Sequence, residues 1–65
     1  MKVTLKSARV NAGYTQKEAA AAIGTNPATI SLWEAQKRTP NIINAQKLCE
    51  LYGVTINDVI FCREN

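Results

Sequence analysis

Basic and amide side chains in the first part of this sequence have the chemistry needed to bind a polyanion. Lys37 and Arg38 stand together in a polar loop, and their ammonium and guanidinium groups can bind phosphate oxygens. The carboxamide of Asn26 can hydrogen-bond either to phosphates or to the edges of nucleic-acid bases. Six basic and two acidic side chains give residues 1–40 a net charge of +4, whereas two basic and three acidic ones give residues 41–65 a net charge of −1. This imbalance favours a polyanionic partner, although ordinary solubilising surface charge would produce the same pattern.

Catalytic and metal-binding chemistry finds little support in the composition. The chain has no histidine, and its five carboxylates are scattered along the sequence. The two cysteines, Cys49 and Cys62, form no CxxC pair, so we expect neither a redox site nor a metal site. Cys49 falls on the apolar stripe of a predicted helix, where it would be a small buried hydrophobic residue. The sequence therefore predicts no enzyme activity, no cofactor and no metal.

The strongest structural pattern around these groups is TQKEAAAAIGTNPATISLW, which begins at Thr15. Thr15 and Glu18 form a capping box, which satisfies backbone N–H groups at the start of a helix. Alanine continues this helix until Gly24, whose left-handed conformation ends it. Asn26 and Pro27 are suited to begin a second helix, as its N-cap and its first residue. Two short helices joined by a glycine turn predict a helix-turn-helix.

Apolar residues at helical spacing predict three further helices around this pair. The first covers about residues 4–12 and ends at Gly13, and the next runs from about residue 42 to Gly53. Thr55 and Asp58 form a further capping pattern, which predicts a last short helix through Val59 and Ile60, with a brief ambiguity towards a strand around residues 54–61. The sequence therefore predicts one all-α domain over its 65 residues, a compact five-helix bundle.

The apolar stripes of these helices should converge in one small core. Ala20 has a specific role there, because its small side chain allows the second and third helices to approach closely. The predicted core residues are Leu5, Ala8, Ala20, Ile23, Ile30, Trp33, Ile42, Ala45, Leu48, Cys49, Tyr52, Val54 and Val59.

Features of one kind of DNA-binding domain recur in order from Leu5 to about Phe61. Their residues are Leu5, Arg9, Gly13, Thr15, Gln16, Lys17, Glu18, Ala20, Ile23, Gly24, Ile30, Trp33, Glu34, Lys37, Arg38, Thr39, Pro40, Leu48, Tyr52, Gly53 and Val54. In this order and spacing the chain resembles the Cro/phage-repressor family of helix-turn-helix proteins, often called Xre-like. The helix-turn-helix core would cover about residues 15–35. The resemblance implies a small stand-alone transcriptional regulator, expected to act as a repressor, that places helix 27–35 in the major groove of double-stranded DNA.

Residues that would touch DNA fall into two groups. The resemblance implies that Gln16 clamps the DNA backbone at the start of the second helix, and Lys37 and Arg38 are expected to form a second clamp. The expected phosphate contacts are Gln16, Lys17, Thr29, Lys37, Arg38, Asn41 and Asn44. The expected base contacts are Asn26, Pro27, Ala28, Ser31 and Leu32. The alternatives are a solvated loop at the second clamp and simple helix-start polarity at the first.

Two departures from the family pattern bear on these expectations. The outer positions of the third helix carry no arginine that could bind a guanine. We therefore expect few direct contacts with bases and some dependence of recognition on DNA shape. Gln36 stands where the family usually has glycine. A left-handed Gln36 would cost about 1 kcal/mol, and the alternative is a different loop path, which would displace Lys37 and Arg38.

Arg9 and Glu34 are expected to join the first helix to the end of the third. The resemblance implies a partly buried ion pair at these positions, and burial makes the loss of one partner costly. The alternative is two exposed charges whose interaction is worth under about 1 kcal/mol. In the ion-pair interpretation, Glu34 anchors the third helix against the rest of the domain.

Hydrophobic residues near the C-terminus are candidates for self-association. Two copies on DNA would recognise an inverted-repeat operator, with their third helices in major grooves about 34 Å apart. The expected residues of this homodimer interface are Leu51, Ile56, Ile60 and Phe61. The alternative function is an antitoxin-like or adaptor module, in which these residues and Leu32 dock a protein partner.

Targeting signals are not evident in the sequence. No apolar run reaches about 18 residues, the length of a membrane span. The N-terminus MKVTLKSARVN has scattered charges and lacks the apolar region of a signal peptide. We therefore expect a cytoplasmic protein without a membrane partner, associated with the nucleoid when it is bound to DNA.

Overall fold

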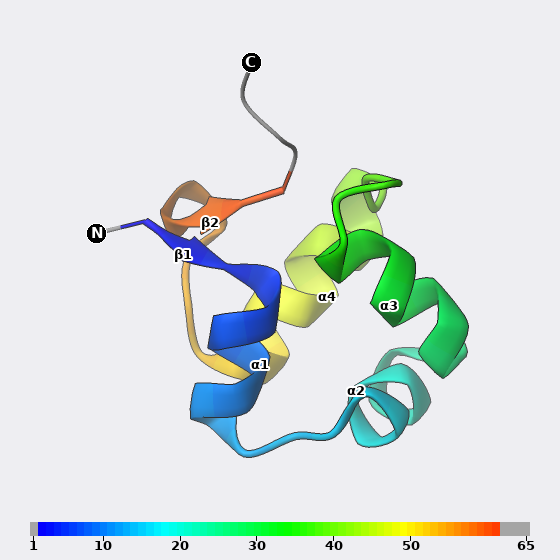
Figure 1. Ribbon diagram of the computed structural model, residues 1–65. Coiled ribbons are helices and arrows are strands. Elements are labelled where there is room, and N and C mark those ends of the chain that lie inside the picture. The colour runs from blue at the N-terminus through cyan, green and yellow to red at the C-terminus, as the bar shows by residue number, and fades with distance from the viewer. Residues whose placement is uncertain (1, 62–65) are drawn as a thin grey trace.

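The computed structural model describes residues 2–61, and Figure 1 shows its elements. They are β1 (Val3–Thr4), α1 (Leu5–Ala12), α2 (Gln16–Ile23), α3 (Pro27–Glu34), α4 (Ile42–Tyr52), the 3₁₀ helix η1 (Ile56–Asp58) and β2 (Val59–Ile60). The first four predicted helices are confirmed, with bounds that differ from the prediction by a single residue at most. No helix within residues 2–61 has the length and apolar character needed to cross a membrane. The expectation for Cys62 falls outside the described residues.

Side-chain caps explain where the helices begin. Thr15 Oγ1 accepts a hydrogen bond from the backbone N–H of Glu18 at 3.0 Å, and Glu18 Oε1 accepts one from the backbone N–H of Thr15 at 2.9 Å. These two bonds complete the expected capping box. Asn26 caps α3 by accepting the N–H three residues later at 2.9 Å, and Thr4 and Asn41 cap α1 and α4 in the same manner. Each helix start is therefore specified by a residue next to it in the sequence.

The expected fifth helix is not formed, although the fold is mostly helical as predicted. Residues 56–58 make a single 3₁₀ turn, after which β2 pairs in parallel with β1. Thr55 makes no side-chain cap to the backbone; its hydroxyl donates instead to Asp58 Oδ2 at 2.8 Å. Val59 and Ile60 are β-branched and favour extended backbone, which pairing with β1 satisfies. The structure is thus a four-helix domain with a small parallel sheet that joins the two ends of the described chain (Figure 1).

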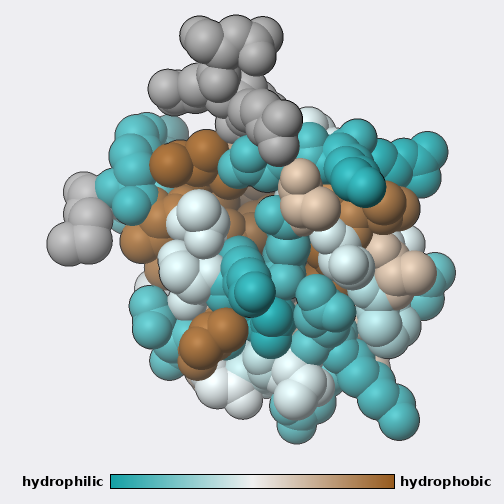
Figure 2. All heavy atoms as spheres, in the orientation of Figure 1, coloured by the Kyte–Doolittle hydropathy of each residue, from teal (hydrophilic) through white to brown (hydrophobic). Residues whose placement is uncertain are grey.

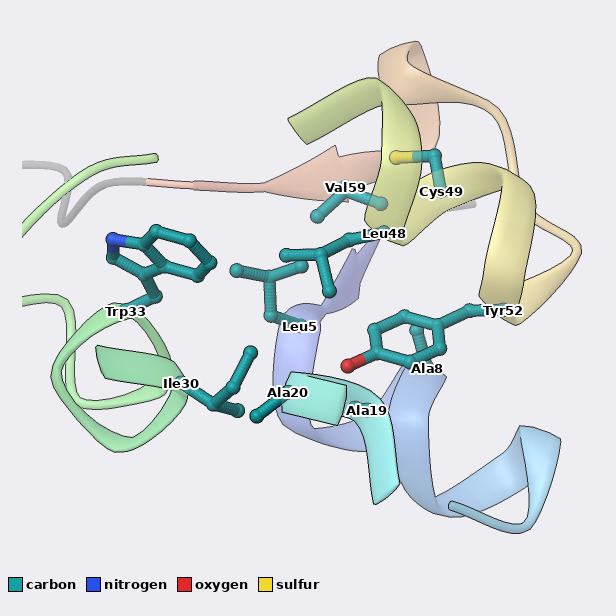
Figure 3. Close-up of a cluster of buried hydrophobic side chains, with 10 residues drawn as sticks. All are labelled: Leu5, Ala8, Ala19, Ala20, Ile30, Trp33, Leu48, Cys49, Tyr52 and Val59. Carbon is teal, nitrogen blue, oxygen red and sulfur yellow. The ribbon is translucent and has the colours of Figure 1, made fainter. Parts of the chain in front are cut away.

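The hydrophobic core lies between the helices and β2, and Figure 3 shows its members pointing toward one another. Ile30 of α3 and Leu48 of α4 are its largest fully buried side chains. The buried hydrophobic residues are Leu5, Ala8, Ala19, Ala20, Ile30, Trp33, Ala45, Leu48, Cys49, Tyr52 and Val59. Ile23 and Val54, also predicted as core, are only partly buried and pack against this cluster. Ala19 belongs to the core, which the sequence did not indicate.

The prediction that Ile42 joins the core is wrong. Its side chain is 62% exposed, and that of the neighbouring Ile43 is 61% exposed. Both residues stand in the first turn of α4, and side chains of a helix lean toward its N-terminus. They therefore extend past the start of α4 instead of covering Ala45 and the buried residues that follow.

Small side chains allow α2 and α3 to pack closely. Ala20 of α2 is 1% exposed and lies beside Ile30 of α3 (Figure 3). Ala21 and Ala22, the next residues along α2, are exposed. The buried alanines of this run must therefore be small to allow close packing, whereas the exposed ones need only a high helix propensity.

Candidate nucleic-acid interface

A tight turn at Gly24 sets the angle between α2 and α3. Gly24 has φ of 80°, a left-handed value that glycine adopts without strain. The backbone N–H of Thr25 returns to the carbonyl of Ala20 at 2.9 Å, and Asn26 then caps the next helix. The connection is therefore short, and the N–H groups of Gly24 and Thr25 tie it back to α2, which limits the freedom of α3 relative to α2.

α3 has one face in the core and one face in solvent. Ile30 and Trp33 are buried on the inner face. Pro27, Ala28 and Ser31, three of the residues expected to contact bases, are exposed on the outer face. Leu32, which was expected there as well, is only partly exposed. The outer face consequently presents small side chains over most of its length.

The ion pair expected between Arg9 and Glu34 is present in the structure. Arg9 Nε lies 2.6 Å from Glu34 Oε2, and Arg9 Nη2 donates to Glu34 Oε1 at 3.3 Å. The two side chains are only 10% and 6% exposed. Hydrogen bonding to Glu34 raises the pKa of Arg9, against the opposing effect of burial. The geometry is that of a two-pronged guanidinium–carboxylate pair, the strong form of such contacts.

Two further hydrogen bonds extend this pair into a network. Arg9 Nη1 donates to the backbone carbonyl of Tyr14 at 2.8 Å, and Gln16 Nε2 donates to Glu34 Oε1 at 3.0 Å. Burial, and then the negative charge of Glu34, raise the pKa of Tyr52 to about 12. The network ties α1, the turn after it and the start of α2 to the last residue of α3.

The end of α3 follows the left-handed path, with Gln36 at φ 61°. The N–H of Gln36 donates to the carbonyl of Trp33 and that of Lys37 to the carbonyl of Leu32, both at 3.1 Å. These two bonds form a Schellman motif, which normally has glycine at the left-handed position. The loop therefore adopts the path with a left-handed Gln36, the more strained of the two paths that the sequence allowed. On this path Lys37 and Arg38 are exposed in the loop that follows α3.

The residues expected to bind phosphates are mostly exposed, but the side chains of Gln16, Thr29 and Asn41 have other partners. Gln16 is half-buried because its amide reaches Glu34. Asn41 Oδ1 accepts the backbone N–H of Asn44 at 2.8 Å as the cap of α4. The exposed members of the set are Lys17, Lys37, Arg38 and Asn41, while Thr29 and Asn44 are partly buried.

Asn26 also has a structural role that limits what it can recognise. Its Oδ1 accepts both the backbone N–H of Thr29 at 2.9 Å and the hydroxyl of Thr29 at 3.1 Å. A carbonyl oxygen has two lone pairs, so this oxygen is saturated, and only the amide hydrogens remain for another molecule. A bidentate contact with adenine, which needs the oxygen as well, would require the loss of one of these two bonds.

The residues expected at a dimer interface are less exposed than the sequence suggested. Leu51, Ile56 and Phe61 are partly buried and pack against the core, and Ile60 is also partly buried. The large hydrophobic residues that are most exposed in residues 2–61 are instead Val10, Ile42 and Ile43. On the face shown in Figure 2, hydrophobic residues form separate small areas within a largely hydrophilic surface.

α2 and α3 are short capped helices joined by a glycine turn. The inner face of α3 is buried in the core, and its outer face is exposed. This arrangement defines a helix-turn-helix domain. A family profile described as helix-turn-helix matches residues 5–59. The chain therefore belongs to this Cro/phage-repressor-type family of DNA-binding transcriptional regulators.

Two curated relatives come from Bacillus subtilis (strain 168). The HTH-type transcriptional regulator ImmR is 43% identical over 51 residues, which are 78% of this chain and 40% of ImmR. The uncharacterized HTH-type transcriptional regulator YgzD is 27% identical over 64 residues, which are 98% of this chain and 97% of YgzD. The chain thus spans less than half of the first relative and almost all of the second. No solved structure gives a significant match.

Proposed function

We propose that the chain is a transcriptional repressor that reads double-stranded DNA by placing the outer face of α3 in the major groove. The observation that best supports this role is the combination of a firmly anchored α3 with an exposed outer face and a basic loop at its end. An α-helix fits the width of the major groove, and nearby cations hold its position by binding phosphates. The names of the two relatives, both transcriptional regulators, point the same way.

Backbone contacts would gather near the C-terminal end of α3. Lys37 and Arg38 lie three and four residues after that end, and Lys17 lies in the first turn of α2, whose first residue is hydrogen-bonded to Glu34. Asn41 keeps its amide hydrogens available while its oxygen caps α4. These contacts would fix the register of α3 without reading sequence.

Base recognition would depend on few direct contacts. Ser31 can donate or accept, whereas Pro27 and Ala28 offer only apolar contact with thymine methyl groups. The saturated oxygen of Asn26 leaves it as a donor only. We therefore expect part of the specificity to come from the shape and deformability of the DNA.

Two copies are expected to bind one operator as a homodimer. Their α3 helices would enter major grooves about 34 Å apart on an inverted repeat. Leu51, Ile56, Ile60 and Phe61 remain the proposed contact between copies, although their partial burial leaves only their outer atoms for it. The cytoplasm, with association to the nucleoid, is the proposed location.

Selection of bound duplexes from a random pool, near physiological salt, tests this function. The proposal predicts an enriched inverted repeat with half-sites about one helical turn apart. A Lys37→Ala/Arg38→Ala chain should retain the preferred sequence but bind more weakly, with a salt dependence flatter by about two units. Lys47→Ala, an exposed lysine on α4, is the matched control and should leave affinity unchanged. No enrichment with the native chain would contradict sequence reading.

The exposed start of α4 supports a second candidate function. Ile42 and Ile43 are adjacent, and both are more than half exposed. An antitoxin-like or adaptor module would use such residues to dock a protein partner. Retained DNA selection after Ile42→Ser/Ile43→Ser would favour the DNA-reading function. Absence of any selected sequence from the native chain would favour protein docking.

A further inference from the structure

Thr29 determines which atoms of the Asn26 side chain are available to another molecule. Asn26 Oδ1 accepts the backbone N–H of Thr29 at 2.9 Å and the Thr29 hydroxyl at 3.1 Å. A backbone N–H can only donate, so the amide atom that faces it must be the oxygen. Asn26 is exposed, and its Nδ2 makes no hydrogen bond within residues 2–61. The side chain therefore presents two amide hydrogens and no free acceptor.

The two bonds from Thr29 have separable roles. The bond from its backbone N–H caps α3 and does not depend on the side chain at position 29. The bond from its hydroxyl adds to this cap and occupies the second lone pair of the Asn26 oxygen. Removal of the hydroxyl would free that lone pair while the backbone cap remains.

The bases differ in what a donor without an acceptor can bind. In the major groove, guanine presents two neighbouring acceptors, N7 and O6, whereas cytosine presents an amino donor. Adenine presents one acceptor beside an amino donor, and thymine presents one acceptor beside its methyl group. An amide nitrogen with two free hydrogens therefore matches guanine best and cytosine worst.

We infer that Asn26 reads guanine, and that Thr29 sets this preference by occupying the amide oxygen. The inference rests on the proposed function, because its ligand is the duplex held against the outer face of α3. Residues at the N-terminal end of a recognition helix face the base edges. The exposed neighbours Pro27 and Ala28 have no polar side-chain atom that could compete for the same base. Thr29 is a positioning residue that acts through Asn26.

Selection of duplexes from a random pool distinguishes this role from simple helix capping. The native chain should enrich guanine at one position of each half-site, and Asn26→Ser should remove the preference there. Thr29→Ala frees the amide oxygen, so that Asn26 can bind N6 and N7 of adenine. The ratio of guanine to adenine at that position should then fall by about 5- to 150-fold. Thr29→Ser keeps the hydroxyl and is the matched control, which should retain guanine.

Asn26→Asp tests the same hydrogen-bond polarity in the opposite direction. Aspartate caps a helix as well as asparagine does, but its ionised carboxylate can only accept hydrogen bonds. The selected base should therefore change from guanine to cytosine, whose amino group donates. Thermal unfolding of each variant verifies that the start of α3 is retained.

Three results would contradict the inference. Retained guanine preference in Thr29→Ala, or adenine in the native chain at the position that depends on Asn26, overturns it while leaving the DNA-binding function intact. A loss of affinity in Asn26→Ser that is equal for every sequence places the amide on a phosphate and also overturns it. If the native chain enriches no sequence, the proposed function and this inference fail together.

Discussion

The two faces of α3 differ in how strongly the rest of the molecule determines them. On the inner face, Ile30 and Trp33 are buried and Glu34 accepts hydrogen bonds from two other side chains. On the outer face, Ala28 and Ser31 are exposed, and the hydroxyl of Ser31 makes no hydrogen bond within residues 2–61. Stability and recognition are therefore assigned to opposite sides of one helix. Substitutions on the inner face should change folding, and those on the outer face should change only what is bound.

The largest effect is expected from breaking the inner-face ion pair. Arg9→Met leaves the carboxylate of Glu34 buried without its cation, which typically costs about 3–5 kcal/mol. The free energy of unfolding is measured by urea denaturation, followed through the fluorescence of Trp33, the only tryptophan. Adding Glu34→Met to Arg9→Met should recover a large part of the loss, since the unpaired charge is removed. Additive effects of the two substitutions would show that the pair does not anchor α3.

A smaller loss is expected from overfilling the contact between α2 and α3. Ala20→Leu places a large side chain against Ile30, where about 1–3 kcal/mol of stability should be lost. Ala21→Leu is the matched control, because this neighbouring alanine is exposed and the change should be within about 0.5 kcal/mol. Equal stabilities of the two variants in urea would mean that α2 and α3 have room to separate.

Gln36 lies in the turn that ends α3, and its substitution by glycine should change stability in the opposite direction. Gln36→Gly removes the strain of a left-handed side chain and should raise stability by at most about 1 kcal/mol. Gln46→Gly, at an exposed position inside α4, should instead lower stability by about 1 kcal/mol. Because glycine keeps the same loop path, the salt dependence of DNA binding should be unchanged in Gln36→Gly. A loss of stability would contradict the assigned backbone conformation.

The sequence predicted those parts of the molecule that depend on neighbouring residues. The bounds of α2 follow from the capping box at Thr15 and from Gly24, which lie within a few positions of the helix they define. The pairing of β1 with β2 joins residues more than fifty positions apart, and no local pattern of caps or periodicity indicates it. The same limit applies at the site. The bond from Gln16 to Glu34 depends on how α2 and α3 pack, so the sequence could suggest these two residues but not the contact between them.

The smallest effect on stability is expected from Asn26→Ser and Ser31→Ala. These two variants also test most directly whether the outer face of α3 contacts bases. Serine at position 26 keeps a cap oxygen for α3 but removes the amide hydrogens, so any base contact by Asn26 is lost while the helix start is retained. Ser31→Ala removes a hydroxyl from an exposed position and should change stability by less than about 0.5 kcal/mol.

Both variants should shift the sequences selected from a random pool while the melting curves stay close to that of the native chain. Asn26→Ala separates the two roles of Asn26, since it should shift the selection and also lose about 1 kcal/mol with the cap. If Asn26→Ser and Ser31→Ala both select the native sequence, these two residues do not read bases. Specificity would then have to come from the apolar contacts of Pro27 and Ala28 or from DNA shape.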